Sequence, residues 1–217
     1  AIVSAKNHKH ALDNPNAYSH KIHTISEIMN SKNITDDLRL LDCSYPCSGG
    51  SSILLASEDV ATKFSDEPVW ISGIGQKTNS ASFVKNELSV LSSSVTASKY
   101  AYDMAKTRPA EIDVAEIHDA FTVCELMAIK DLGLSENENA SDYVRDMFNT
   151  GNRKINPRGG LIGAGHPLGA TGVSQIMEIV MQLQNKAEKR QICGVKKGLI
   201  HNMSAAATSS TVLILES

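Results

Sequence analysis

Short apolar runs alternate with helical patterns along most of this chain, and this alternation limits the possible folds more than any other feature. Strand-like runs lie at residues 69–75, 112–118, 197–203 and 210–217. Helical spacing fills the intervals at residues 92–107, 121–134 and 173–190. The run at 112–118 lacks a clean polar alternation, which is typical of a strand covered on both faces. Strands that alternate with helices predict an α/β layered domain over residues 68–217.

The first part of the chain is predicted to be less regular. Residues 1–40 are polar, rich in Asn and His, and carry one short helical pattern near residues 26–30. We therefore expect a solvated excursion here rather than part of the core. Metal binding or substrate contact is the alternative for its four histidines, although their spacing fits no single helix face. These residues are His8, His10, His20 and His23.

A buried strand is predicted at residues 51–57, after the turn-forming sequence PCSGG. A short helix should follow it, with Ser57 as N-cap and acidic residues in its first turn. These features divide the chain into residues 1–67 and residues 68–217. Within the second part, residues 135–155 are acidic and amide-rich without a strong period, which predicts a surface insertion.

The composition narrows the classes of protein to which the chain can belong. It has 217 residues, of which 41% are apolar, 21% charged and 5% aromatic, as in an ordinary globular protein. The formal net charge is -3 and there is no run of Lys or Arg, so we expect no nucleic-acid partner. No apolar stretch is long enough to span a bilayer, and the N-terminus turns polar too soon for a signal peptide. The sequence therefore predicts a cytoplasmic protein.

The cysteines do not form a metal-binding pattern. Cys43 and Cys47 have CxxxC spacing, but no second pair of ligands follows at the spacing of a zinc site. Cys124 and Cys193 lie in apolar contexts that suit buried structural cysteines. We expect four free thiols and no metal ion.

Two histidines stand where an α/β fold places functional groups. His118 ends the predicted strand 112–118, and ligands gather at such strand ends. A structural histidine, or one that caps the next helix together with Asp119, would give the same pattern. His166 lies in NPRGGLIGAGHPLGATG, residues 156–172, where six glycines surround it. A simple turn explains the glycines, but it does not explain the imidazole at their centre.

Imidazoles at these two positions suit one kind of chemistry. A neutral imidazole with a pKa of about 6.5 can remove a proton from a thiol or an α-carbon, or hydrogen-bond a carbonyl oxygen that gains charge. Two such groups together would suit carbon–carbon bond chemistry next to a thioester. The glycine spacing does not indicate a dinucleotide site, because no strand leads directly into these glycines.

Three motifs carry a resemblance to a known family. They are EIHDAF at residues 116–121, NPRGGLIGAGHPLGATGVSQ at 156–175 and GLIHNMSAAATSSTVLIL at 198–215. The chain resembles the C-terminal half of thiolases, in their archaeal and sterol-carrier-protein-type branch. Weaker similarity through NPNAYSHK and LRLLDCSYPCSGGSSILLAS extends the resemblance over essentially the whole chain.

The resemblance implies an α/β fold with a mixed five-stranded sheet and helices on both faces, preceded by a remnant of the N-terminal half. It also implies an acyl-CoA or acetyl-CoA substrate and a Claisen condensation or its reverse, with no cofactor besides the coenzyme A thioester. His166 would activate a nucleophilic cysteine, and His118 would stabilise the oxyanion. Gly165, Phe121 and Ala205 would contact the substrate, the last through its backbone N–H.

The chain departs from the family pattern in three ways. The nucleophilic cysteine belongs to the N-terminal half, which lies outside these residues. The run 51–57 matches the last strand of that missing half and would expose an apolar face without it. Met203 replaces a catalytic cysteine of bacterial relatives, and residues 204–207 replace glycines or small residues. A methionine cannot transfer a proton.

The first hypothesis from the sequence is a C-terminal subunit or fragment of a thiolase-type acyl-CoA C-acetyltransferase, with the cysteine supplied by a chain that carries the N-terminal half. The alternatives are a degenerate acyl-CoA-binding scaffold and an aldolase-type subunit of the same fold. By resemblance we expect a homo- or hetero-oligomer, with a small OB-fold protein and a hydroxymethylglutaryl-CoA synthase as further partners. Acyl chain length and reaction direction stay open.

Overall fold

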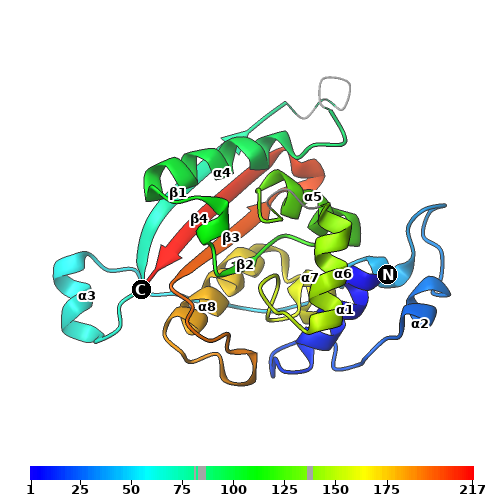
Figure 1. The fold of residues 1–217 in the computed structure, drawn as a ribbon, viewed down its shortest axis with the longest axis horizontal. Coiled ribbons are helices and arrows are strands. Elements are labelled where there is room, and N and C mark those ends of the chain that lie inside the picture. Colours follow the sequence, from blue (N-terminus) through cyan, green and yellow to red (C-terminus); the bar gives the residue numbers. More distant parts are fainter. Residues whose placement is uncertain (81, 83–86, 136–138) are drawn as a thin grey trace.

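The chain folds around a mixed sheet of four strands in the order β1-β4-β3-β2 (Figure 1). The computed structural model describes residues 1–80, 82, 87–135 and 139–217. The strands are β1 (Trp70–Thr78), β2 (Val114–Glu116), β3 (Lys197–Met203) and β4 (Ser209–Glu216). β4 pairs antiparallel with both β1 and β3, whereas β2 pairs parallel with β3. All four predicted strands of the second part are confirmed.

Helices cover both faces of this sheet. α4 (Ser92–Ala105) packs on β1 and β4, and α8 (Thr171–Leu183) packs on β2 and β3. Neighbouring residues of one strand point to opposite faces, so two apolar cores form. Leu199 joins the core with α4 and α5 (Thr122–Asp131), and Ile200 joins the core with α8. The predicted α/β fold is confirmed, with four strands in the described residues instead of the five expected.

The remaining elements are short. The helices are α1 (Ile2–Ala11), α2 (Ile25–Met29), α3 (Glu58–Phe64), α6 (Ala140–Thr150) and α7 (Gly160–Ala164). Single 3-10 turns lie at Leu40–Asp42, Pro109–Glu111, Leu168–Ala170, Glu188–Arg190 and Ala205–Ala207. In the part of the chain that the structure describes, no helix is long and apolar enough to cross a bilayer.

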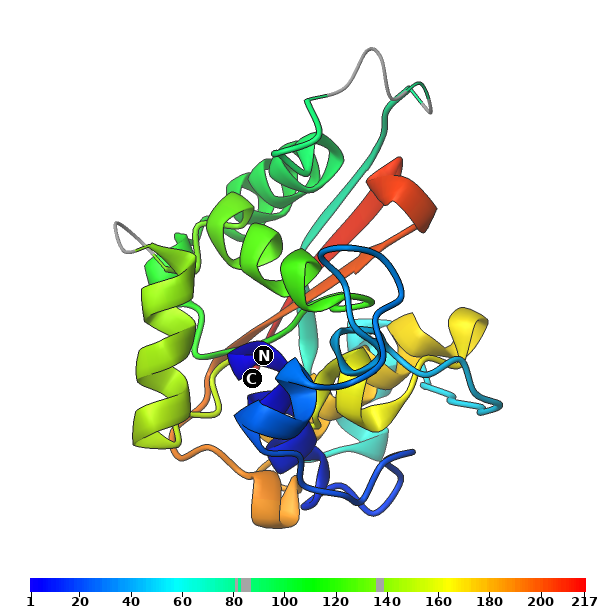
Figure 2. The same cartoon turned by 90° about the vertical axis from the view of Figure 1, so that its right-hand side faces the viewer.

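The prediction of a solvated excursion at residues 1–40 is wrong for α1, which lies inside the molecule. α1 contacts α7 on one side and α6 on the other (Figure 2). Its buried side chains include polar ones, namely Ser4, Lys6, Asn7, His8 and His10. Each of these five makes a hydrogen bond or an ion pair inside the protein. Because these polar side chains find partners inside the protein, α1 can be buried although its polar composition is typical of a surface loop.

The predicted strand at residues 51–57 is also wrong. These residues have no regular structure, and the side chains of Leu54 and Leu55 are 91% and 70% exposed. The physical reason is that no strand within the described ranges is available to pair with them. The helix expected after Ser57 is confirmed as α3, which stands away from the body of the domain and buries none of its residues (Figure 1).

Residues 135–155 contain a helix that the sequence analysis did not expect. α6 begins after the N-cap Asn139 and ends at Gly151, whose φ of 75° closes the helix. Val144 and Met147, one turn apart, are its buried residues. The expectation of no strong period here was wrong, because helical spacing is present in the sequence at Ala140, Tyr143, Val144, Met147 and Phe148. Residues 136–138, part of the predicted insertion, lie outside the described residues.

α8 is confirmed as a helix, and its apolar spacing predicts one face made of Val173, Ile176, Ile179, Val180 and Leu183. Of this face, Ile179 and Leu183 are buried, and Ile176 and Val180 pack against the same core. Four polar residues are buried as well: Ser174, Gln175, Glu178 and Gln182. The helix also ends at Leu183 and not near residue 190, because the chain turns at Asn185, whose φ is 54°. Arg190 then pairs with Glu178 at 3.0 Å.

The glycines of β1 allow α4 to approach the sheet closely. A Cβ atom at Gly75 would lie 1.8 Å from the carbonyl oxygen of Ala97 in α4. We predict that Gly75→Ala displaces the helix and lowers the free energy of unfolding by about 1–3 kcal/mol. Urea denaturation measures this loss. Gly50→Ala is the control, since no atom lies within 4 Å of a Cβ atom there; equal losses in both variants would contradict the packing argument.

Candidate active site

His118 lies just beyond the C-terminal end of β2, where its side chain is 6% exposed. Glu116, the last residue of β2, forms a buried ion pair with Arg158 at 2.8 Å. The Nδ1 atom of His118 is buried and has no hydrogen-bond partner among the described residues. Burial, followed by the nearby His166, lowers the pKa of His118 from 6.5 to about 4. The ring is therefore neutral at physiological pH.

His166 follows α7 and precedes α8, and both its backbone and its ring are held in place. Its backbone N–H donates to the carbonyl oxygen of Tyr45 at 2.8 Å. Its ring Nδ1 lies 2.8 Å from the hydroxyl oxygen of Thr171, the first residue of α8. Burial and the charge of Arg158 lower the pKa of His166 below 6.5. A second neutral imidazole is thus fixed at this end of the sheet.

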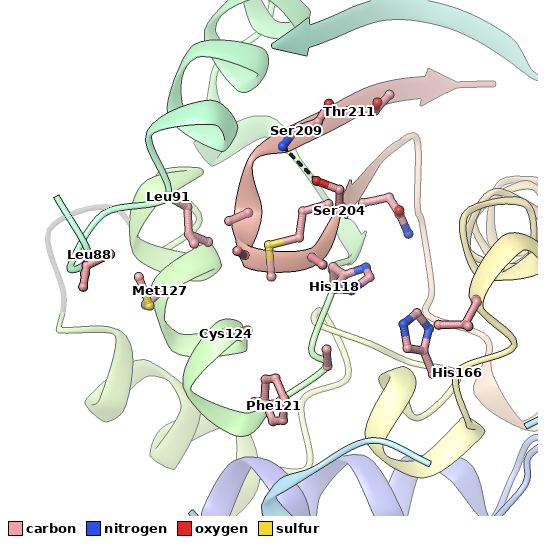
Figure 3. A pocket seen from close by; sticks show the side chains of 17 residues that line it. Leu88, Leu91, His118, Phe121, Cys124, Met127, His166, Ser204, Ser209 and Thr211 are labelled. Atoms are coloured by element: carbon pink, nitrogen blue, oxygen red, sulfur yellow. Dashed lines mark hydrogen bonds between the residues drawn. The ribbon is translucent and has the colours of Figure 1, made fainter. Parts of the chain in front are cut away.

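The two imidazoles meet in space, although α5, α6 and α7 lie between them in the chain. The ring centroids of His118 and His166 are 5.1 Å apart, and the ring planes are nearly perpendicular, at 89° (Figure 3). The structure therefore brings together the two histidines that the motifs EIHDAF and GHPLGATG single out.

Both rings line a cavity of about 810 Å³ at this end of the sheet. Phe121 and Ala205 also line it, as the resemblance implies for substrate-contacting residues. Gly165 does not line it: with a φ of 92°, this residue packs against Cys47 and Tyr18. The end of the cavity away from the histidines is apolar, and Figure 3 shows there the side chains of Leu88, Leu91 and Met127.

The turn at residues 204–207 forms one wall of the cavity in a strained backbone conformation. Ala206 and Ala207 have φ angles of 57° and 51°, in the left-handed region that favours glycine. Ser204 holds the turn, because its hydroxyl oxygen accepts the backbone N–H of Ser209 at 2.9 Å (Figure 3). Ala205 itself has no positive φ, so the strain falls on the two residues after it.

His201 is a buried histidine to which the sequence analysis gave no role. It lies on β3, and its Nε2 is 2.9 Å from the hydroxyl oxygen of Ser94 in α4. Burial, followed by the nearby His118, lowers the pKa of His201 from 6.5 to about 3. The next residue, Asn202, lines the cavity and donates to Gln175 at 2.9 Å. The HN pair near the end of the predicted strand 197–203 is the sequence signal that could have pointed to both residues.

Cys124 is the one cysteine of the described residues that lines the cavity, and its thiol is not activated. All four cysteines are free, but Cys193 is exposed and not buried as expected. Burial raises the pKa of the Cys124 thiol, which keeps it protonated at neutral pH. Within the described ranges, no group of three or more His, Cys, Asp or Glu residues could hold a metal ion.

A mixed α/β sheet with two histidine turns at one end is the arrangement of a thiolase-like domain, and the sequence comparisons agree. The profile of the thiolase C-terminal domain-like family matches residues 75–217. This match covers more than half of the chain, and the chain belongs to that family.

The chain is also similar to two known proteins and to one solved structure. An acetyl-CoA acetyltransferase of Methanothermobacter thermautotrophicus is 36% identical over 217 residues, which are 99% of this chain and 57% of that protein. Sterol carrier protein 2 of Homo sapiens is 35% identical over 211 residues, covering 94% of this chain and 39% of that protein. A structure described as an Ltp2-ChsH2(DUF35) aldolase has a TM-score of 0.85 at 23% identity, covering 100% of this chain and 57% of that one. The last likeness shows the fold, and the chain spans only part of each of these proteins.

The neutral state of His118 gives a prediction for titration. Because its folded pKa of about 4 lies below 6.5, the ring should charge only as the pH falls toward 4. The stability that the neutral ring contributes above pH 6.5 should be lost over the same descent. NMR titration of the imidazole nitrogens measures this midpoint. In His166→Asn the His118 midpoint should rise, because His166 is one of the two causes of the lowered pKa. A His118 midpoint near 6.5 in the unaltered protein would contradict the burial argument.

The strained turn gives a second prediction. Ala206→Gly should raise the free energy of unfolding by about 1 kcal/mol, because glycine adopts a positive φ without steric cost. Thermal or urea unfolding measures the gain. Ala205→Gly is the matched control, because Ala205 has no positive φ and glycine there should only add freedom to the unfolded chain. A gain in the control that equals the gain at Ala206 would refute the assignment of strain.

Proposed function

We propose that this chain is the C-terminal half of a thiolase-type acyl-CoA C-acetyltransferase, which forms or cleaves 3-ketoacyl-CoA by Claisen chemistry. The observation that carries the proposal is the pair of neutral imidazoles, 5.1 Å apart, in the wall of one cavity. Membership of the thiolase C-terminal domain-like family and the acetyl-CoA acetyltransferase relative support it. The acyl-CoA thioester is the substrate, and no further cofactor enters the reaction.

In this proposal His166 is the general base. In the tautomer whose Nδ1–H donates to the hydroxyl oxygen of Thr171, Nε2 is the nitrogen that accepts a proton from a thiol or an α-carbon. A ring with a lowered pKa is neutral at pH 7 and is ready to take up that proton. Thr171 holds the ring in one orientation during the transfer, so the base needs no rearrangement before the reaction.

His118 acts on the oxygen of the thioester. A neutral imidazole that donates a hydrogen bond stabilises the negative charge that develops on this oxygen in the enolate. Its burial strengthens the interaction, because the local dielectric constant is low. The backbone N–H of Ala205 has the same task in the second wall of the cavity. Donors fixed in advance are usually the largest contribution to catalysis of this kind.

The nucleophilic cysteine comes from an N-terminal thiolase half outside these residues. Support for such a covering half lies in an exposed apolar surface, which marks an interaction site. Leu54, Leu55 and Phe64 are 91%, 70% and 83% exposed. Ile71 and Ile74 of the edge strand β1 are 42% and 46% exposed. By family resemblance, the assembly is a homo- or hetero-oligomer, with a small OB-fold protein and a hydroxymethylglutaryl-CoA synthase as further partners.

An aldolase-type reaction is the second candidate. Met203 stands where bacterial relatives carry a catalytic cysteine, and carbon–carbon cleavage without acyl transfer needs no thiol. The aldolase structure with a TM-score of 0.85 supports the same fold for such a site. An acyl-CoA-binding scaffold without chemistry is the remaining alternative. The three hypotheses differ in what the assembled protein does to acetoacetyl-CoA and to an aldol substrate.

Thiolysis of acetoacetyl-CoA by the complex with the N-terminal half tests the proposal. His166→Ala and His118→Ala should each lower the rate by a factor on the order of 100 or more, because each removes a group that acts on the transition state. His20→Ala is the matched control, since His20 is exposed and lies outside the cavity. The rate of this control should equal that of the unaltered complex.

The possible outcomes separate the alternatives. Retro-aldol cleavage without thiolysis favours the aldolase-type reaction. Binding of acyl-CoA without either reaction favours the scaffold. A stable monomer that binds no cysteine-bearing chain, or unchanged rates in both histidine variants, contradicts the proposed acyltransferase.

A further inference from the structure

A buried polar cluster lies directly behind the two histidine turns. It joins α1, α5 and the loop before α7, and each of its side chains is at most 1% exposed. We call it the α1 cluster; its members are Lys6, Asn7, Asp119, Glu125 and Asn156. None of these side chains lines the cavity of the two histidines, so none of them would touch a ligand bound there.

Asp119 is the member that joins the two turns. It follows His118 directly, and its Oδ1 accepts the backbone N–H of Leu161 at 2.6 Å. Its Oδ2 accepts the N–H of Ile162 at 3.4 Å. Leu161 and Ile162 belong to α7, which ends two residues before His166. One carboxyl group therefore links the backbone at His118 to the short helix that carries His166.

The glycines of the loop permit this link. A Cβ atom at Gly160, whose φ is 59°, would lie 2.2 Å from Oδ2 of Asp119. A Cβ atom at Gly163 would lie 2.6 Å from the carbonyl oxygen of Asn7 in α1. Only glycine allows the carboxyl group and α1 to approach α7 so closely. The loop is thus closely packed on the cluster over much of its length.

The other side of His118 is held as well. The backbone N–H of Ile117 donates to Oδ1 of Asn156 at 2.8 Å. The Nδ2 of Asn156 donates in turn to Oε2 of Glu125 at 2.8 Å. His118 therefore lies between two residues that are both tied to the stretch 156–162.

α1 completes the cluster from behind. The Nδ2 of Asn7 donates to Oδ2 of Asp119 and to Oε2 of Glu125, each at 2.7 Å. The Nζ of Lys6 lies 3.1 Å from Oε1 of Glu125. Asn7 thus bridges the two carboxyl groups, and Lys6 balances the charge of one of them.

A buried polar cluster of this kind is not the arrangement that stabilises a helix most. Removing a charged group from water costs several kcal/mol per ion, and apolar side chains of similar volume often give equal or greater stability. Burial and the charge of Glu125 raise the pKa of Asp119 well above its ordinary value. What the polar groups supply, and apolar ones do not, is a fixed direction for each contact.

We propose that Asp119 and Asn7 are positioning residues, which set the distance and orientation of the His118 and His166 rings by tying both turns to α1. The inference rests on the proposed function in taking these two rings as the reacting groups. Lys6, Glu125 and Asn156 complete the framework that holds Asp119 and Asn7 in place.

Asp119→Asn tests the link with little change in volume. An amide nitrogen in place of Oδ2 cannot accept the hydrogen bonds of Asn7 and Ile162, so one side of the link is lost. We expect the turn to loosen and water to reach His118, which raises its NMR titration midpoint from about 4 toward 6.5. Removal of a negative charge at Asp119 would by itself lower the midpoint, and removal of a protonated carboxyl would leave it unchanged. The sign of the shift therefore separates lost positioning from a simple electrostatic effect.

Two further variants complete the experiment on the 217-residue chain. Gly163→Ala pushes α7 from α1 without any change of charge, and should move the His118 midpoint in the same direction. Glu178→Gln breaks the Glu178–Arg190 ion pair, whose side chains are both 4% exposed, without touching either turn. This control should lower the unfolding temperature and leave the His118 midpoint unchanged.

An unchanged or lowered midpoint in both Asp119→Asn and Gly163→Ala would overturn the proposal, whatever the loss of stability. If Asp119→Asn does not fold, Gly163→Ala decides alone. The titration needs no turnover, so a failure of the proposed acyltransferase would appear in the thiolysis assay and not here. With the active complex, both variants should lower kcat more than they raise KM, because the substrate cavity itself is not altered.

Discussion

The close approach of α7 to α1 is the contact on which the rest of the site depends. Gly159 and Gly163 have no room for a Cβ atom, which would lie 2.6 Å from Ala11 or from Asn7. Because these glycines let the two segments touch, the next turn of the chain places His166 opposite His118 at 5.1 Å. The glycine-rich loop is therefore a packed element and not a flexible connector.

Burial, with a smaller contribution from nearby charge, keeps both imidazoles neutral. Burial and the charge of Arg158 lower the pKa of His166, and Glu116, the partner of Arg158, is fully buried two residues before His118. Burial raises the pKa of Glu116 to about 7, although Arg158 acts in the opposite direction. A Glu116 carboxyl that is partly protonated at neutral pH balances the positive charge of Arg158 only in part. In the proposed mechanism, neutrality suits both the base, which accepts a proton, and the hydrogen-bond donor, which must stay uncharged.

The parts that could be predicted from the sequence are those with local signals. The strands and α4, α5 and α8 follow from apolar period, and the two histidine turns follow from their motifs. α1 could not be predicted in this way, because Lys6 and Asn7 find their partners Glu125 and Asp119 more than 100 positions away. The run at 51–57 failed for the opposite reason: its apolar pattern suits a strand, but pairing needs a neighbour that the described residues lack.

The two walls of the cavity differ in how much strain they place on the fold. In the histidine wall neither His118 nor His166 has a positive φ, whereas Ala206 and Ala207 hold left-handed conformations that glycine would adopt freely. Strain of this kind persists only where the surrounding structure enforces it, and it gathers at functional sites. Here Ser204 and Ser209 enforce it by bonding in both directions, N–H of Ser204 to O of Ser209 and N–H of Ser209 to Oγ of Ser204. A turn that keeps alanine residues in an unfavourable backbone conformation is more typical of a functional site than of a degenerate one.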